Sequence, residues 1–170
     1  MHTQELKNNK IILYTDGGAK ENPGVGGYGA VLLYREHKKE LSGGFRLTTN
    51  NRMELLACIE GLKAIKNPLP TVVYSDSRYL VDAINKNWLS GWKKKGWRRG
   101  KDKEVKNVDM WKEMDRLIKG KDIKFKWVKG HSGVWGNERC DELANIEMET
   151  NKNLQIDINY EKSKEGLWKF

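Results

Sequence analysis

The chain has 170 residues, 38% of them hydrophobic, so it can bury a core but leaves little room for a second full domain. No run approaches the roughly 18 apolar residues that a membrane span needs, and the N-terminus lacks the apolar core of a signal peptide, which predicts a soluble, cytoplasmic protein. A net charge of +9 and a pI near 9.4 indicate an anionic partner.

Three strands are predicted in the first third of the chain. Residues 10–15, 28–34 and 40–47 are short runs rich in β-branched and aromatic side chains. The glycines from Gly17 to Gly29 lack the Gly-Lys-Ser/Thr ending of a nucleotide-binding P-loop and lead into a strand. We therefore expect three antiparallel strands and a hairpin turn in this glycine-rich stretch.

Two helices are predicted next, with a short buried strand between them. From Asn51, apolar residues recur at helical spacing until Pro68, which predicts a helix of about four turns. Residues 71–75, TVVYS, are short and apolar and read as a buried strand. Helical spacing returns over residues 79–84.

The remaining elements complete an α/β pattern. We expect helices in the basic segment at 93–106 and over 108–118, a strand over 123–127 and a final helix from about 137 to 148. Strands separated by helices should lie parallel through right-handed crossovers. The prediction is one five-stranded mixed sheet, three antiparallel strands and then two parallel strands, with helices on its faces.

The C-terminal tail is set apart from this pattern. We expect a catalytic unit over residues 1–149, with a basic protrusion at about 88–106, and a tail over 150–170. Within the tail, residues 154–160 alternate like a strand, and the apolar end at 167–170 should dock on the body.

Four acidic residues are placed so that they can meet. Asp16 and Asp76 directly follow the first and fourth predicted strands, and such sheets gather ligands at the carboxyl ends of parallel strands. Glu54 and Asp141 lie in the first turns of predicted helices, where acids also occur simply because they favour helix N-termini. Carboxylates brought together repel each other, so a cluster of them is favourable mainly around a divalent cation.

The positive charge is concentrated in one segment. Residues 93–106, KKKGWRRGKDKEVK, carry eight cations against two acids, a local charge of 8 − 2 = +6. Trp88, Trp92 and Trp97 interleave with these cations. A solvated surface helix would also explain the charge, but cations mixed with aromatic rings are suited to nucleic-acid backbone and bases.

Four ordered motifs resemble the bacterial-type ribonuclease H family. They cover roughly residues 8–147, and the basic insert is similar to that family's basic protrusion. The motifs are Tyr14-Thr-Asp-Gly-Gly with Asn22-Pro-Gly-x-Gly-Gly-Tyr-Gly, Thr49-Asn-Asn-Arg-Met-Glu-Leu, Tyr74-Ser-Asp-Ser, and Lys129-Gly-His-Ser-Gly leading to Asn137-Glu-Arg-Cys-Asp-Glu-Leu-Ala.

The resemblance implies a metal-dependent endoribonuclease that cuts the RNA strand of RNA–DNA hybrids. Asp16, Glu54, Asp76 and Asp141 match the family's metal-binding carboxylates, which hold two Mg²⁺ ions, with Mn²⁺ as a substitute, and leave 5′-phosphate and 3′-hydroxyl ends. His131 matches a histidine in a Gly-flanked loop, a residue type suited to moving a proton near neutral pH. Outside that motif, a lone histidine would be structural or merely exposed.

Substrate contacts are implied in the same way. Asn22, Asn50 and the backbone at Gly17 match positions along the RNA strand, where a 2′-hydroxyl reader is needed. Thr49, Asn51 and the Trp88 region match positions along the DNA strand. For Asn50 and Asn51, helix capping is an alternative role. The basic segment supplies the remaining expected contacts, mostly to backbone, so little sequence preference follows. These residues are Trp92, Lys93, Lys94, Lys95, Trp97, Arg98 and Arg99.

Two positions depart from the family pattern. Arg78 stands where the family often carries Gln, and residues 134–136, Val-Trp-Gly, give the loop after His131 a bulky apolar tip. Both bear on loop motion and fine substrate preference.

Two other function classes fit part of the pattern. A non-catalytic nucleic-acid-binding module would use the basic segment but would have no need of four acids. A DNA-cutting nuclease or transposase of the same fold would keep the acids but not the 2′-hydroxyl reader. A monomer is the plain expectation for the chain.

Overall fold

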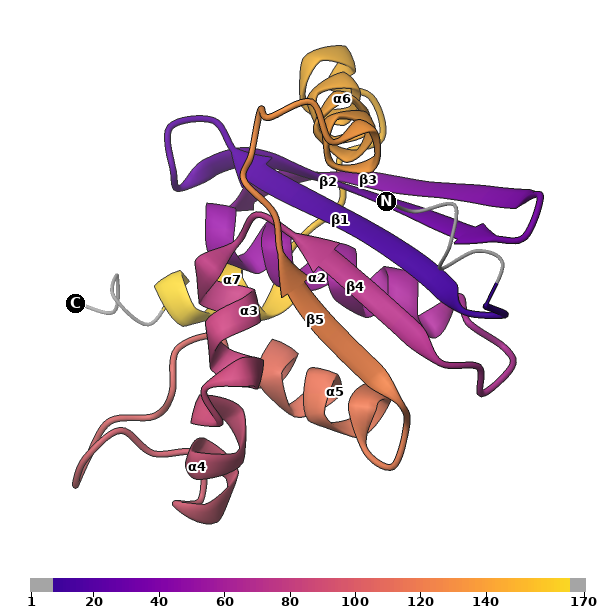
Figure 1. The fold of residues 1–170 in the computed structure, drawn as a ribbon. Coiled ribbons are helices and arrows are strands. Elements are labelled where there is room, and N and C mark those ends of the chain that lie inside the picture. Colours follow the sequence, from indigo (N-terminus) through magenta and orange to yellow (C-terminus); the bar gives the residue numbers. More distant parts are fainter. Residues whose placement is uncertain (1–7, 166–170) are drawn as a thin grey trace.

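The computed structural model describes residues 8–165 and contains one mixed sheet with strand order β3-β2-β1-β4-β5 (Figure 1). The strands are β1 (Ile11–Ala19), β2 (Gly24–Tyr34), β3 (His37–Thr48), β4 (Thr71–Ser75) and β5 (Ile123–Trp127). The first three pair antiparallel, and β4 and β5 join parallel beside β1. The predicted fold class is confirmed.

Helices cover both faces of this sheet. Those in the described residues are α2 (Asn50–Lys63), α3 (Arg78–Asn85), α4 (Trp88–Lys94), α5 (Val108–Ile118), α6 (Trp135–Thr150) and α7 (Ile158–Glu165). In Figure 1, α6 covers one face over β1 and β2, while α2, α3 and α5 lie on the other face. Within residues 8–165, no helix combines the length and apolarity that a membrane crossing requires.

Alternation along β1 supplies the core on both sides of the sheet. Ile11 and Leu13 face the larger core, which α2, α3 and α5 complete. Ile12 and Tyr14 point the other way and pack against Cys140 of α6. A central strand buried on both faces explains why this run is apolar throughout.

The glycine-rich stretch serves packing more than turning. The hairpin turn is confined to residues 20–23, because β1 continues to Ala19 and β2 begins at Gly24. A Cβ atom at Gly29 would collide with the backbone carbonyl of Cys140. The predicted hairpin turn is therefore present but shorter than the glycine-rich stretch, and Gly29 lets α6 approach β2 closely.

The basic segment is helical only at its start. Helix α4 ends at Lys94, and the residues after it form turns in which Val105 N–H donates to the Trp97 carbonyl at 2.9 Å. Gly96 and Gly100 adopt φ values of +64° and +76°, which side-chain-bearing residues rarely adopt. The expectation of a helix over residues 93–106 is corrected accordingly.

The tail is also corrected. Its predicted strand reduces to one bridge between Gln155 and Phe45 of β3, and the chain then forms α7. Asp157, 6% exposed, ends this stretch with an ion pair to Arg52 of α2, 2.6 Å between its Oδ2 and Nε. The apolar end at 167–170 lies outside the described residues.

Replacing Asp157 with Ala should lower the free energy of unfolding by about 3 kcal/mol, because the buried Arg52 guanidinium keeps Asp109 but loses its other carboxylate. Urea denaturation followed by circular dichroism measures the change. The control Glu161→Ala removes the pair with Arg46 on the same segment, which lies nearer the surface, and should lower the stability much less. Equal losses in the two variants would contradict the assignment of Asp157 as the anchor.

Candidate active site

Carboxylates from three separate elements converge at one edge of the sheet. One oxygen each of Asp16, Glu54 and Asp76 lies within 4.8 Å of the others. The parallel register of β1 and β4 ends at the pair Thr15↔Ser75, so Asp16 and Asp76 are the next residues on the two chains. Asp16 lies within β1 and not after it, because antiparallel pairing with β2 continues to Ala19. The sheet register itself sets these two acids side by side.

Helix α2 brings Glu54 to the same point. The helix begins one residue earlier than expected, with Thr49 as its N-cap, whose hydroxyl accepts a hydrogen bond from Arg52 N–H at 3.2 Å. Glu54 therefore opens the second turn, not the first. A Cβ atom at Gly17 would collide with the backbone of Met53 and Glu54. Glycine at position 17 allows β1 and α2 to lie close enough for their acids to meet.

Asp141 stands slightly apart from this group. It lies half-buried in the second turn of α6 and is not one of the residues within 4.8 Å of one another. Its charge nevertheless raises the pKa of both Asp16 and Asp76. The structure thus brings three of the four predicted acids into a tight cluster and the fourth within electrostatic reach.

Burial and mutual repulsion raise the pKa of the clustered carboxyls. Burial, and then the charge of Asp76, raises the pKa of Asp16 to about 7. Burial, and then the charges of Asp16 and Asp76, raises the pKa of Glu54 well above its ordinary value. Burial also raises the pKa of Asp76, while Asn137 opposes the shift. The ionised cluster is therefore unfavourable without a compensating positive charge.

The donor set fits a hard divalent cation. All its ligand atoms are carboxylate oxygens, which Mg²⁺ and Mn²⁺ prefer. Within the described residues, Glu54 Oε2 is buried and has no hydrogen-bond partner. An unpaired buried carboxylate oxygen is costly, and a bound cation would satisfy it. The residues present therefore suit the metal that the family resemblance implies.

The loop after β5 carries His131 to this edge. Its first residue, Val128, donates its N–H to the Ser75 carbonyl at 3.0 Å, which continues the β4–β5 pairing. His131 is exposed with a φ of +53°, and its charge lowers the pKa of Asp76. A Cβ atom at Gly130 would press on the Asp76 carboxylate. The loop therefore passes directly beside the cluster.

Three residues near Asp76 were not assigned a role from sequence. Asn137, 2% exposed, lies one turn before Asp141 on α6. This i, i+4 spacing is the feature of the sequence that could have identified it, because it places the two side chains on the same face of the helix. Trp127 ends β5 and donates its Nε1–H to the Asp76 carbonyl at 3.0 Å. The Arg78 guanidinium lies 3.7 Å from the Trp127 ring centre. This cation–π pair fixes the unusual arginine beside the cluster.

The predicted substrate asparagines lie together at the start of α2. Asn50 donates its N–H to Asn22 Oδ1 at 3.0 Å and accepts the Ala19 N–H through its own Oδ1 at 2.6 Å. The helix cap is Thr49, so capping does not account for Asn50 or Asn51, which are both exposed. These contacts hold the turn after β1 against α2 and leave polar groups facing solvent.

The basic segment divides into supporting and exposed residues. Trp92 and Trp97 are half-buried against the core, whereas Trp88 is 41% exposed. Lys93 forms an ion pair with Asp115 at 2.8 Å. Seven further cations of the segment are exposed and have no ion pair in the described residues. They are Lys94, Lys95, Arg98, Arg99, Lys101, Lys103 and Lys106.

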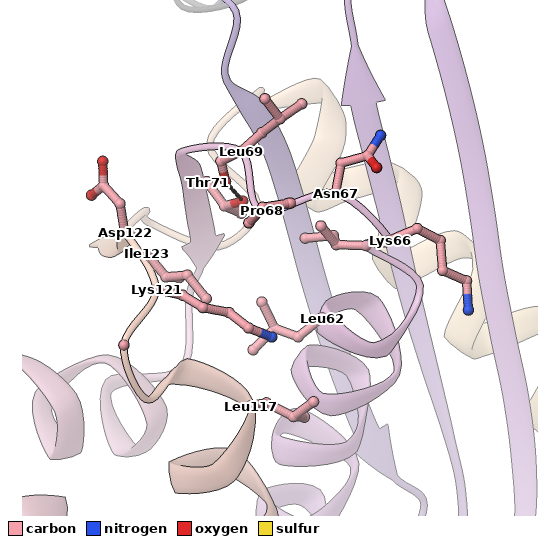
Figure 2. Close-up of a pocket in the computed structure, with 12 residues that line it drawn as sticks. Leu62, Lys66, Asn67, Pro68, Leu69, Thr71, Leu117, Lys121, Asp122 and Ile123 are labelled. Atoms are coloured by element: carbon pink, nitrogen blue, oxygen red, sulfur yellow. Dashed lines mark hydrogen bonds between the residues drawn. The ribbon is translucent and has the colours of Figure 1, made fainter.

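A separate cavity lies at the opposite end of the parallel strands. Figure 2 shows this space of about 180 Å³, lined by Leu62, Leu117 and the loop before β4. Thr71 and Ile123, the first residues of β4 and β5, border it, whereas the acid cluster follows the last residue of β4. Its single acidic lining residue, Asp122, gives it no comparable cation site.

Comparison with known sequences gives consistent matches. A model of the RNase H family matches residues 8–149. A Ribonuclease H of Syntrophus aciditrophicus (strain SB) is 55% identical over 135 residues, which cover 79% of this chain and 78% of that protein. A Ribonuclease H of Rippkaea orientalis (strain PCC 8801 / RF-1) is 50% identical over 152 residues, which cover 89% and 93%.

Solved structures agree with the sequence matches. The crystal structure of LC9-RNase H1, a type 1 RNase H with the type 2 active-site motif, has a TM-score of 0.74 and 28% identity and covers 84% of this chain and 73% of that one. The solution structure of the PFV RNase H domain has a TM-score of 0.69 and 29% identity, with coverage of 82% and 94%. The chain therefore belongs to the ribonuclease H family, in its bacterial type.

Proposed function

We propose that this ribonuclease H hydrolyses the RNA strand of RNA–DNA hybrids with two Mg²⁺ ions, or Mn²⁺ as a substitute, and leaves 5′-phosphate and 3′-hydroxyl ends. The observation that carries the proposal is the convergence of Asp16, Glu54 and Asp76 within 4.8 Å. When bound, the ions lower the pKa of the attacking water and offset negative charge on the departing ribose 3′ oxygen. Little sequence preference is expected, because backbone contacts position the duplex without reading bases.

The chain's own residues divide the remaining work. Asp16, Glu54 and Asp76 hold the ions, and Asp141 completes the ligand set from α6. Asn137 holds the Asp76 carboxylate, whose pKa it lowers. His131, exposed on its loop beside Asp76, is placed to exchange a proton with solvent or to assist departure of the product.

Strand selection falls to the start of α2 and the turn before β2. Asn22, Asn50 and the Gly17 backbone lie along the RNA strand, where a 2′-hydroxyl can be recognised. Thr49 and Asn51 face the DNA strand, together with the Trp88 region. The cations of that segment hold the duplex backbone through Lys93, Lys94, Lys95, Arg98 and Arg99.

We also propose the organisation of the working protein. Residues 1–149 form the catalytic unit, with its basic protrusion at about 88–106, and residues 150–170 form an appended tail. The protein acts as a monomer in the cytoplasm. Light scattering after size-exclusion chromatography tests the oligomeric state.

Replacing Asp16 with Asn should reduce Mg²⁺-dependent hybrid cleavage by about a thousand-fold or more, because the loss of a metal ligand removes several kcal/mol of transition-state stabilisation. End-labelled hybrid, single-stranded RNA, duplex RNA and duplex DNA are compared, each with Mg²⁺ and with chelator. Wild-type protein should cut only the hybrid, and only with metal. Cleavage of duplex DNA would favour the DNA-cutting alternative, and activity with chelator would refute the metal mechanism.

The same substitution should stabilise the metal-free protein at neutral pH. Asp16 has a folded-state pKa raised from 3.8 to about 7, so its ionisation opposes folding. The cost is absent below pH 4, grows as the pH rises and is complete above pH 7, where it amounts to at most about 4 kcal/mol. The unfolding free energies of wild type and Asp16→Asn should therefore diverge between pH 4.5 and pH 8. Parallel pH profiles in chelator would disprove the repulsion.

Neutralising Lys94, Lys95, Arg98 and Arg99 to Gln should weaken hybrid binding and flatten its salt dependence, because fewer counterions are released. The measurement is fluorescence anisotropy of a labelled hybrid across a KCl series in the Asp16→Asn background. Lys119 and Lys121, at the far end of the sheet, serve as control substitutions and should leave the slope nearly unchanged. If the salt slope of the basic-segment variant equals that of the control variant, the basic segment is not part of the binding surface.

A further inference from the structure

The tail lines a cleft that begins at the proposed substrate surface. The family match ends at residue 149, yet α7 contributes Tyr160, Ser163 and Lys164 to a cleft of about 690 Å³. Two proposed DNA-strand residues, Thr49 and Asn51, line the same cleft. Asn51 precedes Glu54 by three residues, which is about 4.5 Å along the helix axis. The cleft is therefore a direct neighbour of the acid cluster.

Several contacts fix α7 against this surface. Asp157, one residue before the helix, pairs with Arg52 and accepts the Thr48 hydroxyl at 2.7 Å. Asn159 donates its side-chain amide to Asp109 Oδ2 at 3.1 Å. With the pair between Arg46 and Glu161 as well, the helix is held at both the α2 and β3 sides. Its cleft-facing residues are thus positioned by the fold.

The chemistry of the cleft suits a phosphate group. Lys106 and Lys164 line it, and neither has an ion-pair partner among residues 8–165. The other lining charges of Arg52 and Asp109 neutralise each other at 2.7 Å. Tyr160 adds a hydroxyl donor, whereas the Ser163 hydroxyl already donates to the Tyr160 carbonyl at 2.6 Å. The Lys164 ammonium lies 5.3 Å from the Tyr160 ring centre. Apart from Asp109, which pairs with Arg52, Glu104 is the acidic residue that lines the cleft. Two unpaired cations, Lys106 and Lys164, are therefore set against one acid.

We propose that α7 is part of the substrate-binding surface and that Lys164, with Lys106, binds a backbone phosphate of the uncut DNA strand. The inference rests on the proposed function, because it takes the DNA strand to run past Thr49 and Asn51. Lys106, which follows the basic segment, and Lys164 of α7 converge on one cleft, as binding of a phosphate requires. The tail would then extend the enzyme's grip beyond the region of the family match.

Hybrid binding by Lys164→Ala tests the proposal against a matched control. Lys162 lies on the same helix and is also exposed, but it does not line the cleft. In the Asp16→Asn background, Lys164→Ala should weaken binding about three- to tenfold and make the salt slope shallower by about 0.9, one phosphate contact. Lys162→Ala should leave both unchanged, and Lys164→Arg should restore most of the affinity. Equal effects at positions 162 and 164 would overturn the proposal.

A methylphosphonate scan identifies the strand. Single neutral linkages are placed along the DNA strand or the RNA strand of the hybrid, and each is bound to wild-type tail and to Lys164→Ala. A methylphosphonate at one position of the DNA strand should weaken binding by the protein with the wild-type tail. The same methylphosphonate should cause no further loss of binding in Lys164→Ala, as a double-mutant cycle requires for two groups in contact. Coupling to an RNA-strand position, or to none, would overturn the assignment. Failure of wild-type enzyme to cut the hybrid with Mg²⁺ would instead refute the proposed function itself.

Discussion

The parallel pairing of β1 with β4 is the constraint on which the site depends. Because the register ends at Thr15↔Ser75, the sheet forces Asp16 and Asp76 together despite their repulsion. The many backbone hydrogen bonds of the sheet and the apolar packing on both faces of β1 outweigh that repulsion. The acids are thus held in advance in an arrangement that a divalent cation stabilises, and the fold bears the electrostatic cost in the cation's absence.

The sequence predicts the sheet well because its signals are local. Apolar alternation and helical spacing depend on near neighbours, so most of the strands and helices, and with them the fold class, were within reach. The predictions that failed are those that depend on long-range packing. Gly27 reads as a turn residue, but it lies in β2 and α6 packs against it. Residues 154–160 alternate like a strand, but the chain there makes one bridge to β3 and Asp157 pairs with Arg52. The tight cluster of three acids, with Asp141 farther out, likewise reflects where α6 docks, which no local pattern encodes.

The substrate surface combines rigid support with exposed charge. Trp92 and Trp97 look like ligand-stacking residues in the sequence, but both are half-buried against the core and so brace the basic segment. Trp88 and the unpaired cations remain accessible. This division is physically sensible, because a charged loop rich in turns needs an apolar anchor if its cations are to stay at fixed positions relative to the acids.

Arg52 links the parts of this surface. Its buried guanidinium bonds to Asp157 before α7, to Asp109 at the start of α5 and to the Asn107 side chain after the basic segment. Burying such a group adds little net stability, because desolvation offsets the attraction between the charges. Its geometric effect is larger, since one planar group with fixed donors sets the tail and the end of the basic segment relative to α2, two residues before Glu54. The arrangement is better explained as positioning than as stabilisation.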